Sequence, residues 1–417
     1  MIDINTSWFR NLAIAVFLLY PIMAIKYIPF GGGARYMSVL AGPLAIFVLV
    51  INYKRINYKT LWNEGLSFTC PFIPLVLCVG FSMLFHGQDF EFITILTRVL
   101  YGCLIYLGAK ELDLSEKNLI YAACLAGFIF FGVSLYEVYF IGRERAFGGT
   151  YENRFAQFSM MMFGLSVIYI LKSKGNVSSI LKVILGLSAF SSLYAVFLTQ
   201  SRGPLLVIPI LIIFFVRHHI VSRLVIISSS MVFLTVMATF FLLENINYLE
   251  RLQLAGDELI RYFNEHQYEG ASVGIRLELW WIAFQTISFD NIFGLGRLSF
   301  VEIGRAVPAL ARSTIIVSNH FPMNGELYPW KYHGDIPEAV GFGGVPLFLS
   351  YIATMILLLK RSLDNLYLLW IVCSLFIFGL SELVVFDKYG FTLFVSCWAL
   401  YSAAQVTRLR FDIGNEV

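Results

Sequence analysis

Three short stretches of this 417-residue sequence combine residue types that could act on a phosphate-bearing substrate. They are Thr199-Gln-Ser-Arg202-Gly-Pro, Gly274-Ile-Arg276, and His333-Gly-Asp335-Ile-Pro-Glu338 with Gly341-Phe-Gly-Gly344 after it. Arginine presents a fork of donors that matches phosphate oxygens, and histidine can accept a proton near neutral pH. Two arginines and one histidine could therefore stabilise a leaving diphosphate and deprotonate an attacking hydroxyl.

Each stretch also has a structural interpretation, which the sequence leaves open. Arg202 could reach the lipid headgroups, and Arg276 could be a surface cation in the first turn of an amphipathic helix. His333 could cap or pack its loop, and Asp335 or Glu338 could orient its ring. His320 is a competing histidine, but it lacks the position at a helix entry.

Further charged residues lie next to apolar runs. Arg143, Arg145 and Arg154 share with Arg202 the side of the membrane that holds fewer cations. Glu382 follows Ser381 in an apolar run, where a carboxylate is costly and is usually paired. It could hold one of the arginines or have a purely structural role.

Several kinds of site have no support in the sequence. There is no DxD motif, no His, Cys and Asp cluster with metal-ligand spacing, no glycine-rich phosphate loop and no Gly-x-Ser-x-Gly elbow. The six cysteines lie within or beside apolar runs and are interpreted as small packing residues. We therefore expect no metal and no cofactor.

The composition defines the class of protein. The chain is 58% hydrophobic and 14% charged, which is too apolar to cover the surface of a soluble enzyme of this length. The net charge of +3 contains no block of like charge, so nucleic acid is excluded as a partner. These numbers predict an all-α polytopic membrane protein with membrane lipids around it.

Long apolar runs predict about twelve transmembrane helices. Their approximate ranges are 8–25, 36–52, 67–85, 92–109, 118–140, 155–171, 177–199, 203–216, 224–243, 341–359, 366–386 and 390–406. Lysine and arginine are twice as frequent on the side that holds both termini, which predicts that both termini are cytoplasmic.

One long polar segment divides the chain. Spans 1–9 occupy residues 1–243, a loop domain occupies 244–340, and spans 10–12 with the C-terminus occupy 341–417. A loop of that length should contain its own elements. Helices are expected around Tyr248–Tyr262 and Val273–Ile287, and a turn at Asp290–Gly296.

The order and spacing of these features resemble the O-antigen ligases, within the superfamily that they share with O-antigen polymerases. The resemblance rests on Leu198-Thr-Gln-Ser-Arg202, Val273-Gly-Ile-Arg276-Leu-Glu-Leu-Trp280, His333 to Gly344 and Leu380-Ser-Glu382. It covers nearly the whole chain. Gly334 departs from the Asn or Ser that often follows the histidine in the family.

The resemblance implies an enzyme of the bacterial inner membrane with its active site facing the periplasm. O-polysaccharide on undecaprenyl diphosphate would be transferred to a sugar hydroxyl of lipid A–core, without metal and with inversion. Arg202 and Arg276 would grip the diphosphate, and His333 would be the base. Arg143, Arg145 and Arg154 would hold a second phosphate or the anionic core.

Three rival interpretations remain. A structural membrane scaffold would be unaffected by changes at Arg202 or His333. An O-antigen polymerase would use the same donor with a lipid-linked repeat unit as acceptor. A lipid-oligosaccharide flippase would move the lipid without chemistry, but it should carry more charge within its spans and have no dominant loop with a histidine.

Overall fold

The computed structural model describes most of the chain. The described residues are 7–21, 25, 36–54, 56–87, 92–149, 151–173, 178–201, 203–210, 246–265, 272–288, 291–298, 300–311, 313–314 and 332–414. Within these ranges every regular element is a helix. The chain forms two compact units, which are Met1–Val76, Glu91–Leu211 and Ala353–Val417 for unit 1, and Leu77–Phe90 and Ile212–Ile352 for unit 2.

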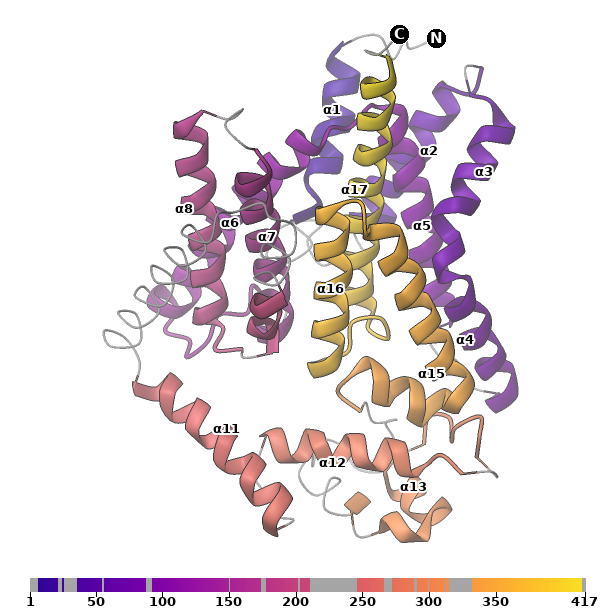
Figure 1. The fold of residues 1–417 in the computed structure, drawn as a ribbon, viewed down its shortest axis with the longest axis vertical. Coiled ribbons are helices and arrows are strands. Elements are labelled where there is room, and N and C mark those ends of the chain that lie inside the picture. Colours follow the sequence, from indigo (N-terminus) through magenta and orange to yellow (C-terminus); the bar gives the residue numbers. More distant parts are fainter. Residues whose placement is uncertain are drawn as a thin grey trace. The chain divides into compact units, whose positions relative to one another are not determined.

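Unit 1 is a bundle of apolar helices (Figure 1). Its helices are α1 (Ser7–Leu18), α2 (Gly42–Ile51) after the π-helix Tyr36–Ala41, α3 (Tyr58–Thr69), α5 (Phe92–Glu111), α6 (Glu116–Leu135), α7 (Glu152–Lys172), α8 (Ser179–Leu198), α16 (Leu366–Ser381) and α17 (Lys388–Gly414). Helices α4 (Ile73–His86) and α15 (Asp335–Ser362) each contribute to both units.

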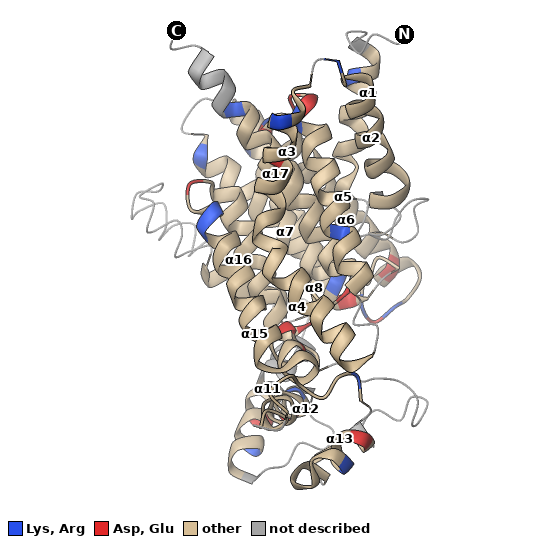
Figure 2. Cartoon of the chain, turned by 90° about the vertical axis from the view of Figure 1, so that its right-hand side faces the viewer, with Lys and Arg blue, Asp and Glu red and all other residues tan. Residues whose placement is uncertain are grey.

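Six of the described helical stretches are long and apolar enough to cross a membrane. They are Tyr58–His86, Phe92–Glu111, Glu116–Phe140, Glu152–Lys172, Ser179–Leu198 and Asp335–Ser362. Most of the helix length is free of charge, and Lys, Arg, Asp and Glu gather mainly towards the helix ends and loops (Figure 2). The chain is thus a multi-pass membrane protein, as predicted, while the count of twelve spans stays a prediction.

Small residues let α6, α7, α8 and α16 approach one another closely. Helix α8 packs against both α6 and α7, and the three lie side by side in Figure 1. A Cβ at Gly127 would clash with Ser188 of α8, and one at Gly164 would clash with Trp370 of α16. The Trp370 indole N–H donates to the Met161 carbonyl oxygen at 3.1 Å. Close packing of this kind replaces the hydrophobic driving force that helices lack in lipid.

Two helix ends differ from the apolar runs, and each has a local cause. The predicted span at 67–85 extends back to Tyr58, because the Asn57 side chain accepts hydrogen bonds from the backbone of Lys59 and Thr60 at 3.0 and 3.4 Å. The predicted span at 366–386 ends earlier, at Ser381. Glu382 is extended, with φ −151° and ψ 162°, although the residues that follow it remain apolar.

Unit 2 contains the described part of the long polar segment. Its helices are α11 (Ile246–Glu265), α12 (Ser272–Gln285) and α13 (Phe300–Ala306), with a 3-10 turn at Pro308–Leu310. The two predicted helices of this segment are therefore present. Helix α12 buries one face, which carries Ile275, Leu279, Ile282 and Ala283. The span predicted at 224–243 and the aromatic stretch before Tyr332, including His320, lie outside the described residues.

Candidate functional site

A buried carboxylate organises the loop between α6 and α7 in unit 1. A π-helix at Tyr136–Phe140 continues α6 and contains Glu137, which is fully buried. Its carboxylate accepts backbone N–H groups from Phe147 at 2.7 Å, Gly148 at 2.9 Å and Gly149 at 3.3 Å. It also pairs with the Arg143 guanidinium at 3.0 Å. We call Glu137 with residues 141–149 the Glu137 cradle.

The Glu137 cradle is bound to the Thr199-Gln-Ser motif at the end of α8. The Ala146 N–H donates to the Leu198 carbonyl at 2.9 Å, and the Gln200 amide donates to the Glu144 carbonyl at 3.0 Å. The φ of Gln200 is 54°, in the left-handed region that a non-glycine residue seldom occupies. This contact network fixes the backbone directly before Arg202, which itself lies outside the described residues.

Asn153 links the same motif to Glu382. The Ser201 hydroxyl donates to the Asn153 carbonyl oxygen at 2.7 Å, and the Asn153 amide donates to the Glu382 carboxylate. Asn153 was not among the predicted site residues. Its polar neighbours Glu152 and Arg154 are the signal in the sequence that marks this helix end as polar.

Arg154 pairs with Asp387, at the start of α17. A guanidinium nitrogen lies 2.5 Å from the Asp387 carboxylate. The guanidinium carbon lies 5.0 Å from the ring centroid of Tyr151 and 5.1 Å from that of Tyr389. The second Asp387 oxygen accepts the N–H groups of Tyr389 and Gly390, both at 2.9 Å, and so caps α17. Glu382 was expected to pair with one of the arginines, and the carboxylate that pairs with Arg154 is that of Asp387.

Arg145 has a weaker ion pair than Arg143 or Arg154. Its guanidinium lies 3.7 Å from the Glu152 carboxylate, and the two side chains are 35% and 36% exposed. It also donates to the Gln200 carbonyl at 3.4 Å. An exposed pair at this distance is worth little free energy, so an incoming anion could replace Glu152 at low cost.

In unit 2, Arg276 lies near the start of α12, as predicted, and is half-buried. The carboxylate of Glu258 from α11 accepts the N–H of Val273 at 2.9 Å. A carboxylate thus already binds one of the backbone N–H groups in the first turn of α12. The Tyr262 hydroxyl donates to Glu278 at 3.1 Å and forms a second link between α11 and α12.

His333 lies in a strained turn directly before α15. Its φ is 52°, and its side chain is half-buried. The Glu338 carboxylate accepts the Tyr332 N–H at 2.7 Å, and the Glu338 N–H donates to the Gly334 carbonyl at 3.0 Å. Glu338 therefore holds the backbone on both sides of His333. Strain of this kind is stored at functional sites more often than elsewhere.

The residues around His333 are almost completely shielded from solvent. Asp335 and Glu338 are 0% and 1% exposed, and the Tyr332 ring packs edge-on against Phe342 with 5.6 Å between centroids. Burial, and secondarily the Glu338 carboxylate, raises the pKa of Tyr332 far above its ordinary value. Tyr332 is therefore neutral at physiological pH and cannot replace His333 as a base.

A helix break at Gly344 joins α15 to the predicted turn after α12. Gly344 has φ 62° and ψ −154°, which interrupts the helix. The N–H groups of Leu295 and Gly296 donate to the carbonyls of Gly341 and Phe342, both at 3.1 Å. A backbone loop thus docks on these glycines, and a Cβ at Gly344 would clash with the backbone of that loop.

No group of three or more His, Cys, Asp and Glu residues in the described ranges could hold a metal ion. The groups that gather around the motifs are instead carboxylates, guanidinium groups and backbone N–H groups.

The match to a known family begins in α8 and ends two residues before His333. Residues 187–331 match the family model described as O-antigen ligase. This confirms the resemblance to the O-antigen ligase and polymerase superfamily over about a third of the chain. The matched segment contains both arginine motifs. No curated protein matches the chain.

The structure thus brings some of the predicted site residues together and is silent on others. In unit 1, the Glu137 cradle with Arg143 and Arg145 contacts the Thr199-Gln-Ser motif, which reaches Glu382 through Asn153. In unit 2, Asp335 and Glu338 lie within one turn of His333 at the start of α15, and Arg276 lies in α12.

Proposed function

We propose that this protein is an O-antigen ligase. It would transfer O-polysaccharide from undecaprenyl diphosphate to a sugar hydroxyl of lipid A–core at the periplasmic face of the bacterial inner membrane. The observation that carries the proposal is the family match over residues 187–331, which contains Arg202 and Arg276. The strained turn that presents His333 two residues later supports it.

In the proposed reaction, His333 takes the proton from the acceptor hydroxyl. The resulting oxygen attacks the anomeric carbon, and the bond between that carbon and the diphosphate oxygen breaks. The displacement inverts the anomeric centre and releases undecaprenyl diphosphate. Arg202 and Arg276 would neutralise the charge that develops on the leaving diphosphate, a role that arginine can fulfil without a metal.

The ion pairs divide the accessory cations into two groups. Arg143 and Arg154 are bound to the buried carboxylates of Glu137 and Asp387, so we assign them to positioning the polar end of α6–α8. The ion pair of Arg145 with Glu152 is long and partly exposed, so Arg145 is the best candidate for a direct contact with a substrate phosphate or the anionic core.

The decisive experiment for the assignment is transfer in vitro. Purified protein in lipid would be mixed with lipid-linked polymer and core lipid, with and without EDTA. We expect polymer-capped core lipid in both reactions. A strict requirement for a divalent ion would contradict the arginine mechanism, and transport of the lipid-linked donor without a new glycosidic product would favour the flippase.

Complementation separates a ligase from a polymerase. A strain without ligase accumulates long polymer on the carrier lipid, whereas a strain without polymerase adds a single unit to its core. We expect this chain to restore the first strain. Restoration of the second strain alone would assign the acceptor to a lipid-linked repeat unit.

Arg276→Lys tests the forked contact with the diphosphate. A lysine keeps the charge but cannot form the bidentate contact, so we expect transfer to fall by about tenfold or more. Arg261→Lys in α11 is a matched control, because Arg261 is an exposed helix arginine of unit 2. Wild-type activity in Arg276→Lys would make Arg276 a surface cation only.

A further inference from the structure

The other end of α6, α7 and α8 contains a polar cavity of about 630 Å³. Its charged lining residues are Glu116, Lys117, Lys172 and Arg408. Glu116 pairs with Lys172 at 3.2 Å and lies 3.9 Å from Arg408. Three cations therefore face one carboxylate, and the cavity has an excess of positive charge.

Tyr367 also lines this cavity, and its hydroxyl is closed off from solvent. The Lys172 ammonium lies 4.6 Å from the centroid of the Tyr367 ring, so a cation contacts this wall of the cavity.

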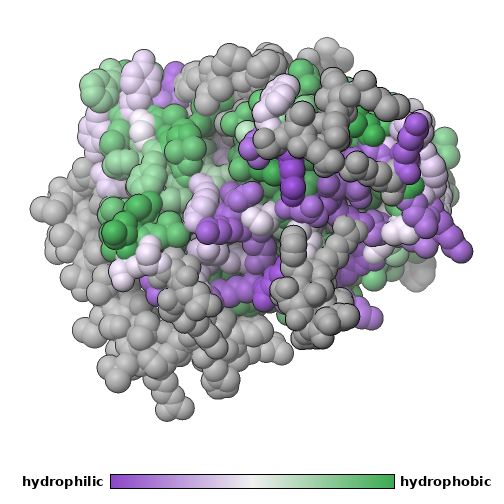
Figure 3. Space-filling model, turned by 90° about the horizontal axis from the view of Figure 1, so that it is seen from above, coloured by the Kyte–Doolittle hydropathy of each residue, from purple (hydrophilic) through white to green (hydrophobic). Residues whose placement is uncertain are grey.

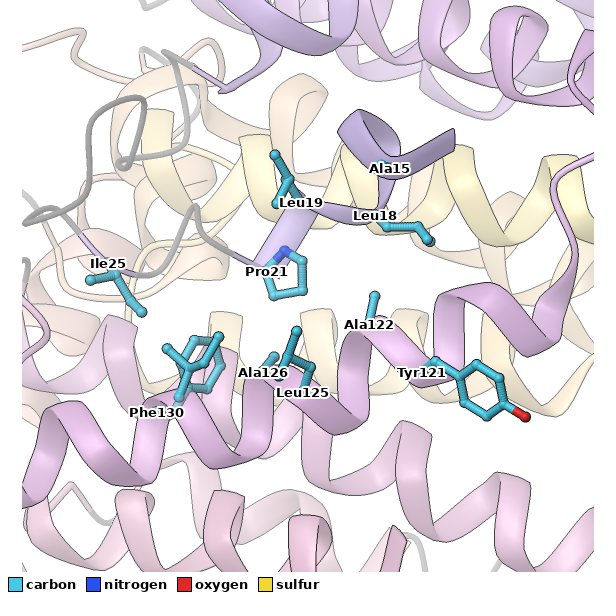
Figure 4. A pocket seen from close by; sticks show the side chains of 11 residues that line it. Ala15, Leu18, Leu19, Pro21, Ile25, Tyr121, Ala122, Leu125, Ala126 and Phe130 are labelled. Carbon is cyan, nitrogen blue, oxygen red and sulfur yellow. The ribbon is translucent and has the colours of Figure 1, made fainter. Parts of the chain in front are cut away.

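An apolar groove of about 340 Å³ adjoins the cavity through a shared residue. Tyr121 lines both, and the rest of the groove is formed by apolar side chains of α1 and α6 and the segment after α1, such as Leu18, Pro21, Leu125 and Phe130. Figure 4 shows Tyr121 at one end of this row, with its hydroxyl pointing away from the other side chains. A cationic cavity that continues into an apolar groove matches a phosphate headgroup with an acyl chain.

We propose that this cavity and groove together bind one anionic phospholipid of the surrounding bilayer. The phosphate would lie among Lys117, Lys172 and Arg408, and an acyl chain would lie along Tyr121 and Leu125. Seen from above, the described residues form a hydrophilic area beside apolar areas (Figure 3), as expected where headgroups meet the bundle. The site is separate from the transfer chemistry proposed above.

The test compares the full-length protein in nanodiscs of phosphatidylcholine with and without phosphatidylglycerol. Native mass spectrometry would count the phosphatidylglycerol molecules retained, and thermal unfolding would be followed in parallel. We expect wild-type protein to retain phosphatidylglycerol preferentially. Lys172→Ala should weaken retention by about fivefold, the effect of one basic residue on an anionic lipid. Lys54→Ala, at an exposed lysine outside the cavity, should retain lipid normally.

A second variant tests the groove without changing any charge. Ala122→Phe fills the groove next to Tyr121, so we expect it to lose the retained lipid as well. It also keeps the test valid if Lys172→Ala does not fold. Equal stabilisation by both lipids would overturn the proposal. Stabilisation by inorganic phosphate that survives in Ala122→Phe would also overturn it, because the cavity would then bind free phosphate.

Discussion

The two ends of α6, α7 and α8 differ in how their carboxylates are bound. At one end, the buried carboxylates of Glu137 and Asp387 are each bound by backbone N–H groups and one arginine. At the other end, one carboxylate, Glu116, faces three cations across an open cavity, and one of its oxygens has no partner within the described residues. The first end is completed by the protein itself, and the second has room for an external anion.

This difference indicates what each end is for. Buried charges that are bound by several hydrogen bonds fix a unique geometry, as a motif next to the proposed reaction centre would require. A partly bound cationic cavity gains free energy only when a ligand enters it. We therefore expect substitutions at the Glu137 end to affect folding and transfer together, and substitutions at the Glu116 end to affect lipid binding.

The largest effect should come from Glu137→Ala. It leaves Arg143 and the N–H groups of Phe147 and Gly148 without their acceptor, which should cost about 3–5 kcal/mol and abolish transfer. Thermal unfolding of the purified protein would measure the loss. Glu144→Ala is the control, because that exposed side chain is in the same loop. Equal stability of the two variants would remove the distinction between the two ends.

The second effect concerns the ion pair of Arg154. Arg154→Ala leaves the Asp387 carboxylate, which is 4% exposed, without its cation and should cost about 2 kcal/mol in unfolding free energy. Asp387→Asn should lower the unfolding free energy less in the Arg154→Ala background than in the wild type, because the ion pair is already absent there. Additive effects in this double-mutant cycle would show that the two residues do not interact.

The third effect is on substrate affinity without a change in stability. Arg145→Ala should change the unfolding free energy by less than about 0.5 kcal/mol, because its pair with Glu152 is exposed. If Arg145 contacts substrate, KM for the donor or acceptor should rise several-fold, and Glu152→Gln should lower it by releasing Arg145. An unchanged KM in both variants would show that Arg145 does not contact substrate.

The smallest effect is expected at Glu116. Glu116→Gln removes the negative charge from the cationic cavity and leaves Lys172 and Arg408 for the lipid phosphate. Retention of phosphatidylglycerol should rise by about fivefold, with transfer activity unchanged. Weaker retention would mean that Glu116 positions the cations rather than competing with the lipid.

Apolar runs and their periodicity predicted many of the described helices. The apolar runs at 92–109, 118–140, 155–171 and 177–199 are helices, and so are the two stretches expected in the polar segment. Arg276 lies near the start of α12, as predicted. These features are local, so the residues that form them are neighbours along the chain.

The contacts between motifs could not be predicted in this way. Nothing in the sequence around Glu137 tells that its partners are the N–H groups of a loop about ten residues later, because backbone donors have no sequence signature. Asn153 joins Ser201 to Glu382 across three segments far apart in the chain. Leu295 and Gly296 dock on α15 where the helix breaks at Gly344. In the sequence, a glycine at this position is equally compatible with close packing of two helices.

The central claim is that the His333 imidazole is the base of a glycosyl transfer, and one pair of variants tests it directly. His333→Ala removes the imidazole but places a residue poorly suited to φ 52° in the turn, whereas His333→Asn removes it and tolerates that backbone. Transfer by the purified proteins would be measured at equal amounts of folded protein. We predict that both variants lose activity by about 100-fold or more. Substantial activity in His333→Asn would contradict the account.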